Sequence, residues 1–440
     1  MSELTYARLI GDLFPRLTGG IRWGVDRTER LLEAVGDPHH RYATIHVGGT
    51  NGKGSVAATL ASVLAAAGLR VGLYTSPHLC TFRERILVDG RPLSEADLVA
   101  CATELWPWIR REAPSFFEAT TAIAFLAFAR LDVEIAVVEV GLGGRLDATN
   151  VIIPEVSVIT NVARDHAEYL GETIEEIASE KAGIMKPGVP VVTGESGGAY
   201  GLLMRRAREV GAPFHRLDPA AVQGVRVDRD GTRFRLRSRA WGVLELHTPL
   251  IGAHQARNAA LAVEALAQLP REFRPRAEAI VEGVRRVRWP GRLQWEERDG
   301  QNWIFDAAHN PAGVEAVVDA LRSLRVPQPV VAVVGILREK DWAGMLRPLC
   351  AFADTLVLTV PPTAPEHRRW DPERAAAGLA SCEAEVVRDF GGALAVARAR
   401  AGEGTVLVTG SFHTVGDALA RLGLAPHGVD PPLPMAVGQP

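Results

Sequence analysis

Short apolar runs alternate with longer amphipathic segments along most of the chain. Five runs in the first half have the length of buried strands: Ala43–Val47, Val71–Tyr74, Ile135–Val140, Val156–Thr160 and Val189–Val192. Four segments have apolar residues at helical spacing: Ser55–Ala67, Glu95–Arg111, Phe117–Arg130 and Ile174–Ile184. This alternation predicts a mainly parallel sheet with helices on both faces.

The pattern changes after about residue 213. Three short strand candidates follow one another without helical segments between them: Val225–Val227, Arg233–Leu236 and Leu244–His247. Asp230-Gly231 stands between the first two runs and is typical of a hairpin turn. These features predict a small antiparallel insert near residues 213–250.

The alternation of strands and helices resumes near residue 302, after the chain-breaking pair Pro290-Gly291. The expected strands of this second unit are Asn302–Phe305, Val330–Val334, Thr355–Thr359 and Thr405–Thr409. We therefore predict two α/β domains. Residues 1–290 would form a domain with a mainly parallel sheet, and residues 291–440 would form a smaller, Rossmann-like domain.

The composition narrows the partners and the location. With 23% charged residues and a net charge of −3, the chain lacks the basic surplus that nucleic acid or an anionic membrane would attract. No apolar run approaches about 18 residues, the length of a membrane span. The segment Met1–Arg16 does not resemble a signal peptide. We expect a monomeric, cytoplasmic protein whose partners are small molecules.

The cysteines agree with that location. Cys80, Cys101, Cys350 and Cys382 lie far apart in the chain and form no CxxC pair. In a reducing compartment such cysteines are usually buried or half-buried free thiols. We therefore predict four free thiols.

The strongest chemical signal is a glycine-rich loop between an expected strand and an expected helix. Its sequence is Gly48-Gly49-Thr50-Asn51-Gly52-Lys53-Gly54-Ser55. Small residues let backbone N–H groups converge on phosphate oxygens, and a helix N-terminus and Lys53 add positive charge. The loop departs from GxxxxGK[ST], because Val47 holds the first glycine position and Gly54 separates Lys53 from Ser55. A plain strand–helix turn is the alternative, but the context favours a nucleotide phosphate site, so we expect residues 1–290 to form a P-loop ATPase-type domain.

Polar residues at the ends of other strands would share one edge with this loop, because ligands of parallel sheets bind at the carboxyl ends of the strands. Ser76, Glu139 and His166 lie at or just after three such ends. Ser76 and Glu139 supply the oxygen donors that Mg²⁺ prefers. His166 is an unusual ligand for so hard an ion and can equally be structural or catalytic. Glu139 can also simply cap its strand.

Two further segments have a functional and a plain interpretation. Lys181 lies on a charged helix, where a single lysine is usually solvated. Asp306 and His309 follow the first strand of the second domain and would face a cleft between the domains. Helix capping explains that second segment equally well.

Together these motifs resemble the Mur ligase superfamily and, within it, folylpolyglutamate synthase/dihydrofolate synthase. The matching segments, which occur in the family's order, are Gly49–Ser55, Tyr74–His78, Phe82–Ile86, Glu139–Gly144, Asp165-His166, Glu180–Gly183, His254-Gln255 with Asn258, Trp289–Arg292 and Asp306–Pro311. The Gly54-Ser55 ending is typical of the folate branch. The segment Arg145–Asn150 resembles the bifunctional bacterial type, which also acts on dihydropteroate.

The resemblance implies a role for each group of residues. The implied ATP ligands are Gly49, Thr50, Asn51, Gly52, Lys53, Gly54, Ser55, Asn258, Arg292 and Asp306. The implied Mg²⁺ ligands are Ser76, Glu139 and His166, with a monovalent cation such as K⁺ as a further candidate. The implied catalytic residues are Lys53, Lys181 as a carbamate, and His309. The implied substrate contacts are Phe82, Arg83, Arg145, Asp147 and Ser411.

The activity that the resemblance implies is addition of L-glutamate to the carboxylate of a folate, and of dihydropteroate, through an acyl phosphate with release of ADP and phosphate. Two positions depart from the family's pattern: Ala307 replaces a glycine, and Phe412-His413 stands where we expect Leu-Tyr. Three rivals stay open. A cell-wall ligase would use a UDP-muramyl substrate, an amide ligase for storage polymers would usually be longer, and a regulatory protein would bind ATP without substrate-dependent ADP release.

Overall fold

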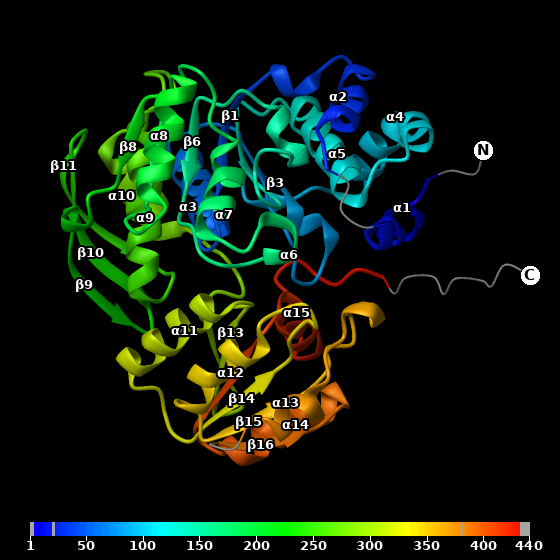
Figure 1. Ribbon diagram of the computed structural model, residues 1–440, viewed down its shortest axis with the longest axis vertical. Coiled ribbons are helices and arrows are strands. Elements are labelled where there is room, and N and C mark those ends of the chain that lie inside the picture. The colour runs from blue at the N-terminus through cyan, green and yellow to red at the C-terminus, as the bar shows by residue number, and fades with distance from the viewer. Residues whose placement is uncertain (1–3, 20–22, 380–381, 432–440) are drawn as a thin grey trace, which may run out of the picture.

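The computed structural model describes residues 4–19, 23–379 and 382–431, and its two large sheets lie in separate halves of the molecule (Figure 1). The first sheet has eight strands in the order β4-β3-β2-β5-β1-β6-β7-β8. They are β1 (Ala43–Gly48), β2 (Val71–Tyr74), β3 (Ile86–Val88), β4 (Arg91–Pro92), β5 (Ile135–Glu139), β6 (Val156–Ile159), β7 (Val191–Thr193) and β8 (Phe214–Arg216). All neighbours are parallel except β2–β3 and β3–β4, so the predicted mainly parallel α/β fold is confirmed.

Helices cover both faces of this sheet (Figure 1). One face carries α1 (Tyr6–Leu13), α2 (Asp26–Glu33), α4 (Glu95–Glu112) and α5 (Phe116–Arg130), and the other carries α3 (Lys53–Ala66), α9 (Ala253–Leu266) and α10 (Ala277–Arg286). Near β6 and β7 lie α6 (Ala167–Leu170), α7 (Ile174–Ala182) and α8 (Tyr200–Val210). In β5, Ile135 and Val137 face the α3 side while Ala136 and Val138 face the α5 side. Because successive strand residues alternate between faces, a fully apolar strand indicates two covered faces.

A small antiparallel sheet follows β8, in the region where an insert is predicted. Its strands are β9 (Val222–Asp228), β10 (Gly231–Ser238) and β11 (Gly242–Thr248), in the order β11-β10-β9. Phe234 and Leu236 of β10, with Leu244 and Leu246 of β11, belong to the core cluster that also contains α9 and α10. The alternating polar residues of β10 are exposed.

The second large sheet has six strands in the order β12-β13-β17-β14-β15-β16, parallel except for β12–β13. They are β12 (Gln294–Arg298), β13 (Gln301–Asp306), β14 (Val330–Val334), β15 (Thr355–Leu358), β16 (Glu383–Val386) and β17 (Thr405–Thr409). The helices are α11 (Pro311–Leu324), α12 (Trp342–Cys350), α13 (Pro372–Ala377), α14 (Phe390–Ala401) and α15 (Phe412–Arg421). The edge strands β12 and β16 were not predicted, because both are half-exposed and rich in charge. None of the described helices has the length and hydropathy of a membrane span.

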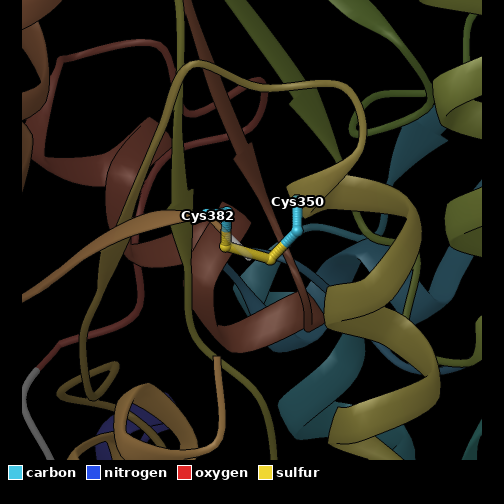
Figure 2. Close-up of a disulfide and its surroundings, with 2 residues drawn as sticks. All are labelled: Cys350 and Cys382. Atoms are coloured by element: carbon cyan, nitrogen blue, oxygen red, sulfur yellow. A yellow bond between two sulfur atoms is a disulfide. The ribbon is translucent and has the colours of Figure 1, made fainter. Parts of the chain in front are cut away.

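Cys350 and Cys382 form a disulfide, so the prediction of four free thiols is wrong for this pair (Figure 2). Cys350 ends α12, the helix before β15, and Cys382 directly precedes β16. Since β15 and β16 begin side by side, these two positions meet, with Cα atoms 5.3 Å apart, a normal separation for a disulfide. Their sequence separation of 32 hides this proximity from the sequence. Cys80 and Cys101 are free.

Candidate functional site

A cavity of about 370 Å³ lies between the two domains, at the carboxyl ends of the strands of both sheets. All residues expected to bind ATP, metal or the reacting groups line it: Gly49, Thr50, Asn51, Gly52, Lys53, Gly54, Ser55, Ser76, Glu139, His166, Lys181, Asn258, Arg292, Asp306 and His309. The five expected substrate contacts do not line it: Phe82, Arg83, Arg145, Asp147 and Ser411. The residues that strand ends were expected to bring together therefore do line one cavity, and the substrate residues implied by the resemblance lie outside it.

The phosphate loop is held in shape by the chain that follows β6. The backbone N–H of Thr50 donates to the Asn161 carbonyl over 3.0 Å, and the backbone N–H of Asn51 donates to Asn161 Oδ1 over 3.0 Å. Lys53 begins α3, and its Nζ donates to the Thr50 carbonyl over 3.1 Å. These hydrogen bonds order the loop. The loop leads into the N-terminus of α3, whose first N–H groups have no partners within the helix. Asn161 was missed by the sequence analysis, although it too follows a strand end.

Two glycines of the loop leave room for residues from distant elements. Gly52 has φ +84°, and a Cβ there would lie 2.6 Å from Asn258 Oδ1 on α9. A Cβ on Gly54 would lie 2.7 Å from Nε1 of Trp289, which lies in the linker between α10 and β12 (residues 287–293). Gly54 is the extra glycine that departs from the usual P-loop pattern. Because it has no side chain, it leaves the space in which the linker packs against the loop.

Glu139 and Ser76 meet at the ends of β5 and β2. The Glu139 side chain is buried, and its Oε2 accepts a hydrogen bond from the Ser76 backbone N–H over 3.2 Å. Burial raises the pKa of Glu139, while the nearby cations Lys53 and Arg292 oppose that rise. The carboxylate is therefore placed where an additional cation would favour its charged form.

His166 is a neutral imidazole at neutral pH. Burial, and then the ammonium group of Lys340, lower its pKa to about 3. Its Nε2 lies 3.3 Å from Lys340 Nζ. A neutral ring nitrogen has a lone pair for a cation or a hydrogen bond, so both interpretations of His166 stay chemically possible.

Lys181 on α7 is buried, so the plain interpretation as a solvated helical lysine is wrong. Its Nζ donates to the Gly49 carbonyl over 3.0 Å. Burial, assisted by the nearby charge of Lys53, lowers the pKa of Lys181 to about 7. A large fraction of its amine is therefore neutral near pH 7, directly behind the phosphate loop.

Two polar side chains of the C-terminal domain reach across the cleft. Lys340 Nζ forms an ion pair with Asp165 Oδ1 over 2.6 Å, and the two side chains are only 7% and 8% exposed. Asn310 Nδ2 lies 3.0 Å from Asn51 Oδ1 and 3.0 Å from Asp165 Oδ2. Burial alone would raise the pKa of Asp165, but Lys340, together with the neighbouring His166 and His309, outweighs it and holds this pKa well below its usual value. The sequence analysis missed Lys340, which lies in the polar run Arg338–Asp341 after β14.

Asp306 closes the end of β13 onto the linker. Its two carboxylate oxygens accept hydrogen bonds from the backbone N–H groups of Leu293 and Ala308, each over 2.8 Å. Burial raises the pKa of Asp306, and Arg292 opposes that rise. The residue therefore both stabilises the backbone and lines the cavity, so the capping and binding interpretations are compatible.

Phe412, at the start of α15, lies between two of the expected site residues. The Arg292 guanidinium carbon is 5.1 Å from the centre of its ring, and the rings of Phe412 and His309 are 5.5 Å apart. Such distances allow a cation–π contact with Arg292. The phenylalanine that departs from the expected Leu-Tyr pair therefore lines the cavity and orders its neighbours.

Phe82 and Arg83 form part of a turn beside the cavity. The Phe82 ring is fully buried and packs against the rings of Phe14 and Phe116, and its expected contact with the substrate stays a prediction. Arg83 Nη1 donates to the Leu93 carbonyl over 3.1 Å. Through these contacts Phe82 and Arg83 stabilise the shape of the turn without lining the cavity. Aromatic partners so distant in the sequence could not be predicted from the motif.

The other expected substrate residues also serve neighbouring backbone. Arg145 pairs with Glu180 over 2.9 Å, and its side chain is exposed. Asp147 is buried and accepts a hydrogen bond from the Leu142 backbone N–H over 2.8 Å. Ser411 is buried and caps α15. In this arrangement none of the three lines the cavity; each supports a neighbouring loop or helix, and their roles as direct substrate contacts stay predictions.

Comparison with known proteins identifies both domains. The family model for the Mur ligase middle domain matches residues 47–266, and that for the Mur ligase, glutamate ligase domain matches residues 291–412. Folylpolyglutamate synthase of Lacticaseibacillus casei is 39% identical over 365 residues, which are 80% of this chain and 84% of that protein. Dihydrofolate synthase/folylpolyglutamate synthase of Escherichia coli is 35% identical over 401 residues, 89% of each.

Solved structures agree over nearly the whole length. Mycobacterium tuberculosis folylpolyglutamate synthase complexed with ADP superimposes with a TM-score of 0.87 and 34% identity, over 95% of this chain and 98% of that chain. E. coli FolC in complex with DHPP and ADP superimposes with a TM-score of 0.84 and 32% identity, over 96% of this chain and 98% of that chain. The chain belongs to the Mur ligase superfamily and, within it, to the folylpolyglutamate synthase/dihydrofolate synthase family.

Proposed function

We propose that this chain is an ATP-dependent ligase that joins L-glutamate to the carboxylate of a reduced folate, and that it also adds glutamate to dihydropteroate. The observation that carries the proposal is the cavity between the domains, which the phosphate loop lines from one side and Asp306 and His309 line from the other. Ligation needs such a site, because the nucleotide, the acceptor and the amino acid must meet away from water. The names of the relatives from L. casei and E. coli support the same activities.

The nucleotide would lie across the domain boundary. The loop Gly49–Ser55 and the N-terminus of α3 would hold the phosphates, and Lys53 and Arg292 would neutralise their charge. Asn258 on α9 would contact the adenine, and Asp306 would accept hydrogen bonds from the ribose. The ADP named for the relatives from M. tuberculosis and E. coli supports the use of ATP.

The donor set at the cavity fits Mg²⁺. Ser76 and Glu139 offer oxygen, the buried Glu139 carboxylate gains from a nearby cation, and the His166 ring is neutral. Within the described residues no group of three or more His, Cys, Asp and Glu side chains could hold a metal by itself. Phosphate oxygens and water would therefore complete the coordination, as is usual for Mg²⁺. When bound, the ion would neutralise charge on the transferred phosphoryl group. A monovalent cation such as K⁺ is a further candidate.

The proposed chemistry has two steps. A carboxylate oxygen of the acceptor attacks the γ-phosphorus of ATP, the bond from that phosphorus to the β–γ bridging oxygen breaks, and ADP leaves. The α-amine of L-glutamate then attacks the acyl carbon of the acyl phosphate, the C–O bond to phosphate breaks, and the amine gives up a proton as the amide forms. Lys53, Arg292 and the end of α3 would stabilise the developing charge. His309 would border the incoming glutamate, and Ser411, which caps α15 next to the cavity-lining Phe412, would support that side of the cavity.

Lys181 would carry a carbamate in the active protein. Its pKa of about 7 leaves neutral amine available at neutral pH, and only a neutral amine reacts with CO₂. The neutral amine forms an N–C bond with CO₂ and loses one proton, which gives an anionic carbamate; counted from the ammonium form, two protons are released. That anion would lie beside Gly49, where it would add negative charge next to the expected cation site.

The acceptor would bind beside the turn of Phe82 and Arg83 and the loop of Arg145 and Asp147. Both segments border the cavity-lining chain, since Ser76-Pro77 precedes the turn and Val140–Gly143 precedes the loop. Their side chains would act by holding these segments. The name of the bifunctional relative from E. coli supports dihydropteroate as a second acceptor.

ADP release with Mg-ATP and L-glutamate tests the proposal, with dihydropteroate, tetrahydrofolate or no acceptor. Release with both acceptors, together with products of the expected mass, is the expected result. Release with tetrahydrofolate alone would leave a folylpolyglutamate synthase, and no stimulation by either would contradict the folate assignment. Lys53→Ala should reduce turnover by at least about 100-fold without unfolding the protein. Arg206→Ala removes a cation that pairs with Glu209 on the exposed surface, outside the cavity, and should leave turnover unchanged.

A further inference from the structure

The chain beyond α15 returns to the N-terminal domain (Figure 1). There Asp430 meets the segment Cys80–Phe82, which is 348 residues away at Phe82. Its backbone N–H donates to the Cys80 carbonyl over 3.3 Å. Its carboxylate accepts from the Phe82 backbone N–H over 2.7 Å, from Thr81 Oγ1 over 2.6 Å and from the Tyr6 hydroxyl over 2.5 Å.

Asp430 completes a set of hydrogen bonds that the turn cannot supply alone. The backbone N–H groups of Leu79, Cys80 and Thr81 all donate to the carboxylate of Glu84, within the turn. The next N–H, that of Phe82, donates to Asp430 instead. Since the Phe82 side chain is fully buried, loss of Asp430 would leave a donor that water reaches poorly, which is costly.

The same carboxylate joins α1 to the turn. Burial and the hydrogen bond to Asp430 raise the pKa of the Tyr6 hydroxyl, so it stays a donor throughout the neutral range. The Arg83 guanidinium lies over the Tyr6 ring at 5.9 Å. Asp430 therefore holds both the backbone before Arg83 and the ring against which its side chain rests.

The turn leads directly from the wall of the cavity. Ser76 and Pro77 line the cavity, and the turn η3 (Phe82–Arg85) follows them. Cys80 also contacts the C-terminal domain, with its Sγ 3.5 Å from the Gly416 carbonyl. The position of the turn thus depends on residues at the end of the chain.

We propose that Asp430 is a positioning residue for the acceptor: it holds the Thr81–Arg85 turn in the shape that the folate or pteroate acceptor requires. The inference rests on the proposed function, because it takes this turn to border the acceptor. Asp430 itself would touch no reactant. Through Asp430, the end of the C-terminal domain would fix the shape of the cavity where the acceptor binds and would leave the nucleotide-binding side unchanged.

Asp430→Asn tests this, because an amide keeps the size of the side chain but places a donor where only acceptors fit. We expect the KM for tetrahydrofolate to rise about tenfold, as for the loss of one charge-assisted hydrogen bond, with the KM for ATP unchanged. Asp371→Asn is the matched control. Like Asp430, Asp371 is a C-terminal-domain aspartate that accepts a hydrogen bond from a backbone N–H, but it does so at the start of α13. Equal rises in both KM values, or no change in either, would overturn the proposal.

Amide hydrogen exchange gives a reading that needs no turnover. The peptide covering residues 79–88 should exchange about tenfold faster in Asp430→Asn than in the unaltered protein and in Asp371→Asn. Unchanged exchange would overturn the proposal, and so would faster exchange with an unchanged KM for tetrahydrofolate, which would show a mere anchor. If the unaltered protein gave no folate-stimulated ADP release, the proposed function would fail, while the exchange rates would still decide whether Asp430 holds the turn.

Discussion

Trp289 of the linker packs against Gly54 in the first turn of α3, so closely that a Cβ on Gly54 would lie 2.7 Å from Trp289 Nε1. Gly54 directly follows Lys53, and Trp289 comes shortly before Arg292. One contact therefore sets the distance between the two cations that we assign to the ATP phosphates. The glycine that makes the loop an atypical P-loop is required by this contact.

Gly54→Ala should weaken nucleotide binding while the protein stays folded. The added methyl group must displace the indole or the loop, and overpacking of this kind costs about 1–3 kcal/mol. We expect the KM for ATP to rise about tenfold or more, since each 1.4 kcal/mol changes an equilibrium constant tenfold. Initial rates at varied ATP give the measurement.

The matched control for that change is Gly198→Ala. No atom lies within 4 Å of a Cβ at Gly198, and its backbone is not in the left-handed region. Its KM for ATP should equal that of the unaltered protein. An unchanged KM in Gly54→Ala would mean that the linker does not fix the loop.

Asp165 and Lys340 should be strongly coupled across the domain boundary. Both side chains are almost fully buried, and removal of one partner leaves an uncompensated charge, which costs about 3–5 kcal/mol. Asp165→Asn and Lys340→Met should each lower the free energy of unfolding, and the double variant should lose much less than the sum. Urea titrations of the four proteins measure the coupling.

The exposed pair Arg235–Glu245 serves as the control for that cycle. It has a similar distance, 2.7 Å, but both side chains are more than half exposed. Its coupling should be below about 1 kcal/mol, as is usual for surface ion pairs. Equal coupling of the buried and the exposed pair would contradict the assigned role of Asp165 and Lys340 in joining the domains.

Lys181 should make stability depend on pH in an alkaline window. Its pKa is lowered from 10.5 to about 7, so between these values the unfolded chain binds a proton that the folded protein does not. Stability then rises with pH across that window, by up to about 1.4 kcal/mol per unit, and the penalty is complete below about pH 7. Lys181→Met should lack this component.

The unfolding free energies of the unaltered protein and of Lys181→Met should therefore converge as the pH rises from about 7 to 10. Urea titrations in CO₂-free buffer measure this, because carbamate formation would otherwise remove the titrating amine. A difference that stays constant across the window would show that Lys181 is not desolvated.

Local patterns in the sequence predicted most of the framework. The strands Val71–Tyr74 and Val330–Val334 were predicted with their observed bounds, because each is an uninterrupted apolar run buried on both faces. The phosphate loop was predictable because all its chemistry lies within Gly49–Ser55. Ser76 and Glu139 could be predicted at the same edge of the sheet, because the carboxyl ends of parallel strands lie along one edge. The cytoplasmic location and the monomeric state stay predictions.

Contacts between distant segments were not predictable in this way. In the sequence, Lys340 is one charged residue in a polar run, and only the fold shows that it pairs with Asp165. The sequence does not show that the ring of Phe116 packs against that of Phe82. Asp430 lies in a tail rich in proline and glycine, where nothing in the pattern indicates its partners on the turn.

The most direct test of the account follows one oxygen atom. The acceptor carboxylate is labelled with ¹⁸O, and the inorganic phosphate released with Mg-ATP and L-glutamate is examined by mass spectrometry. Attack of the carboxylate on the γ-phosphorus leaves one acceptor oxygen on the phosphate after the amine has displaced it. We predict one ¹⁸O atom in each phosphate released during ligation. Unlabelled phosphate formed together with glutamylated product would contradict the acyl phosphate and, with it, the proposed reaction of this site.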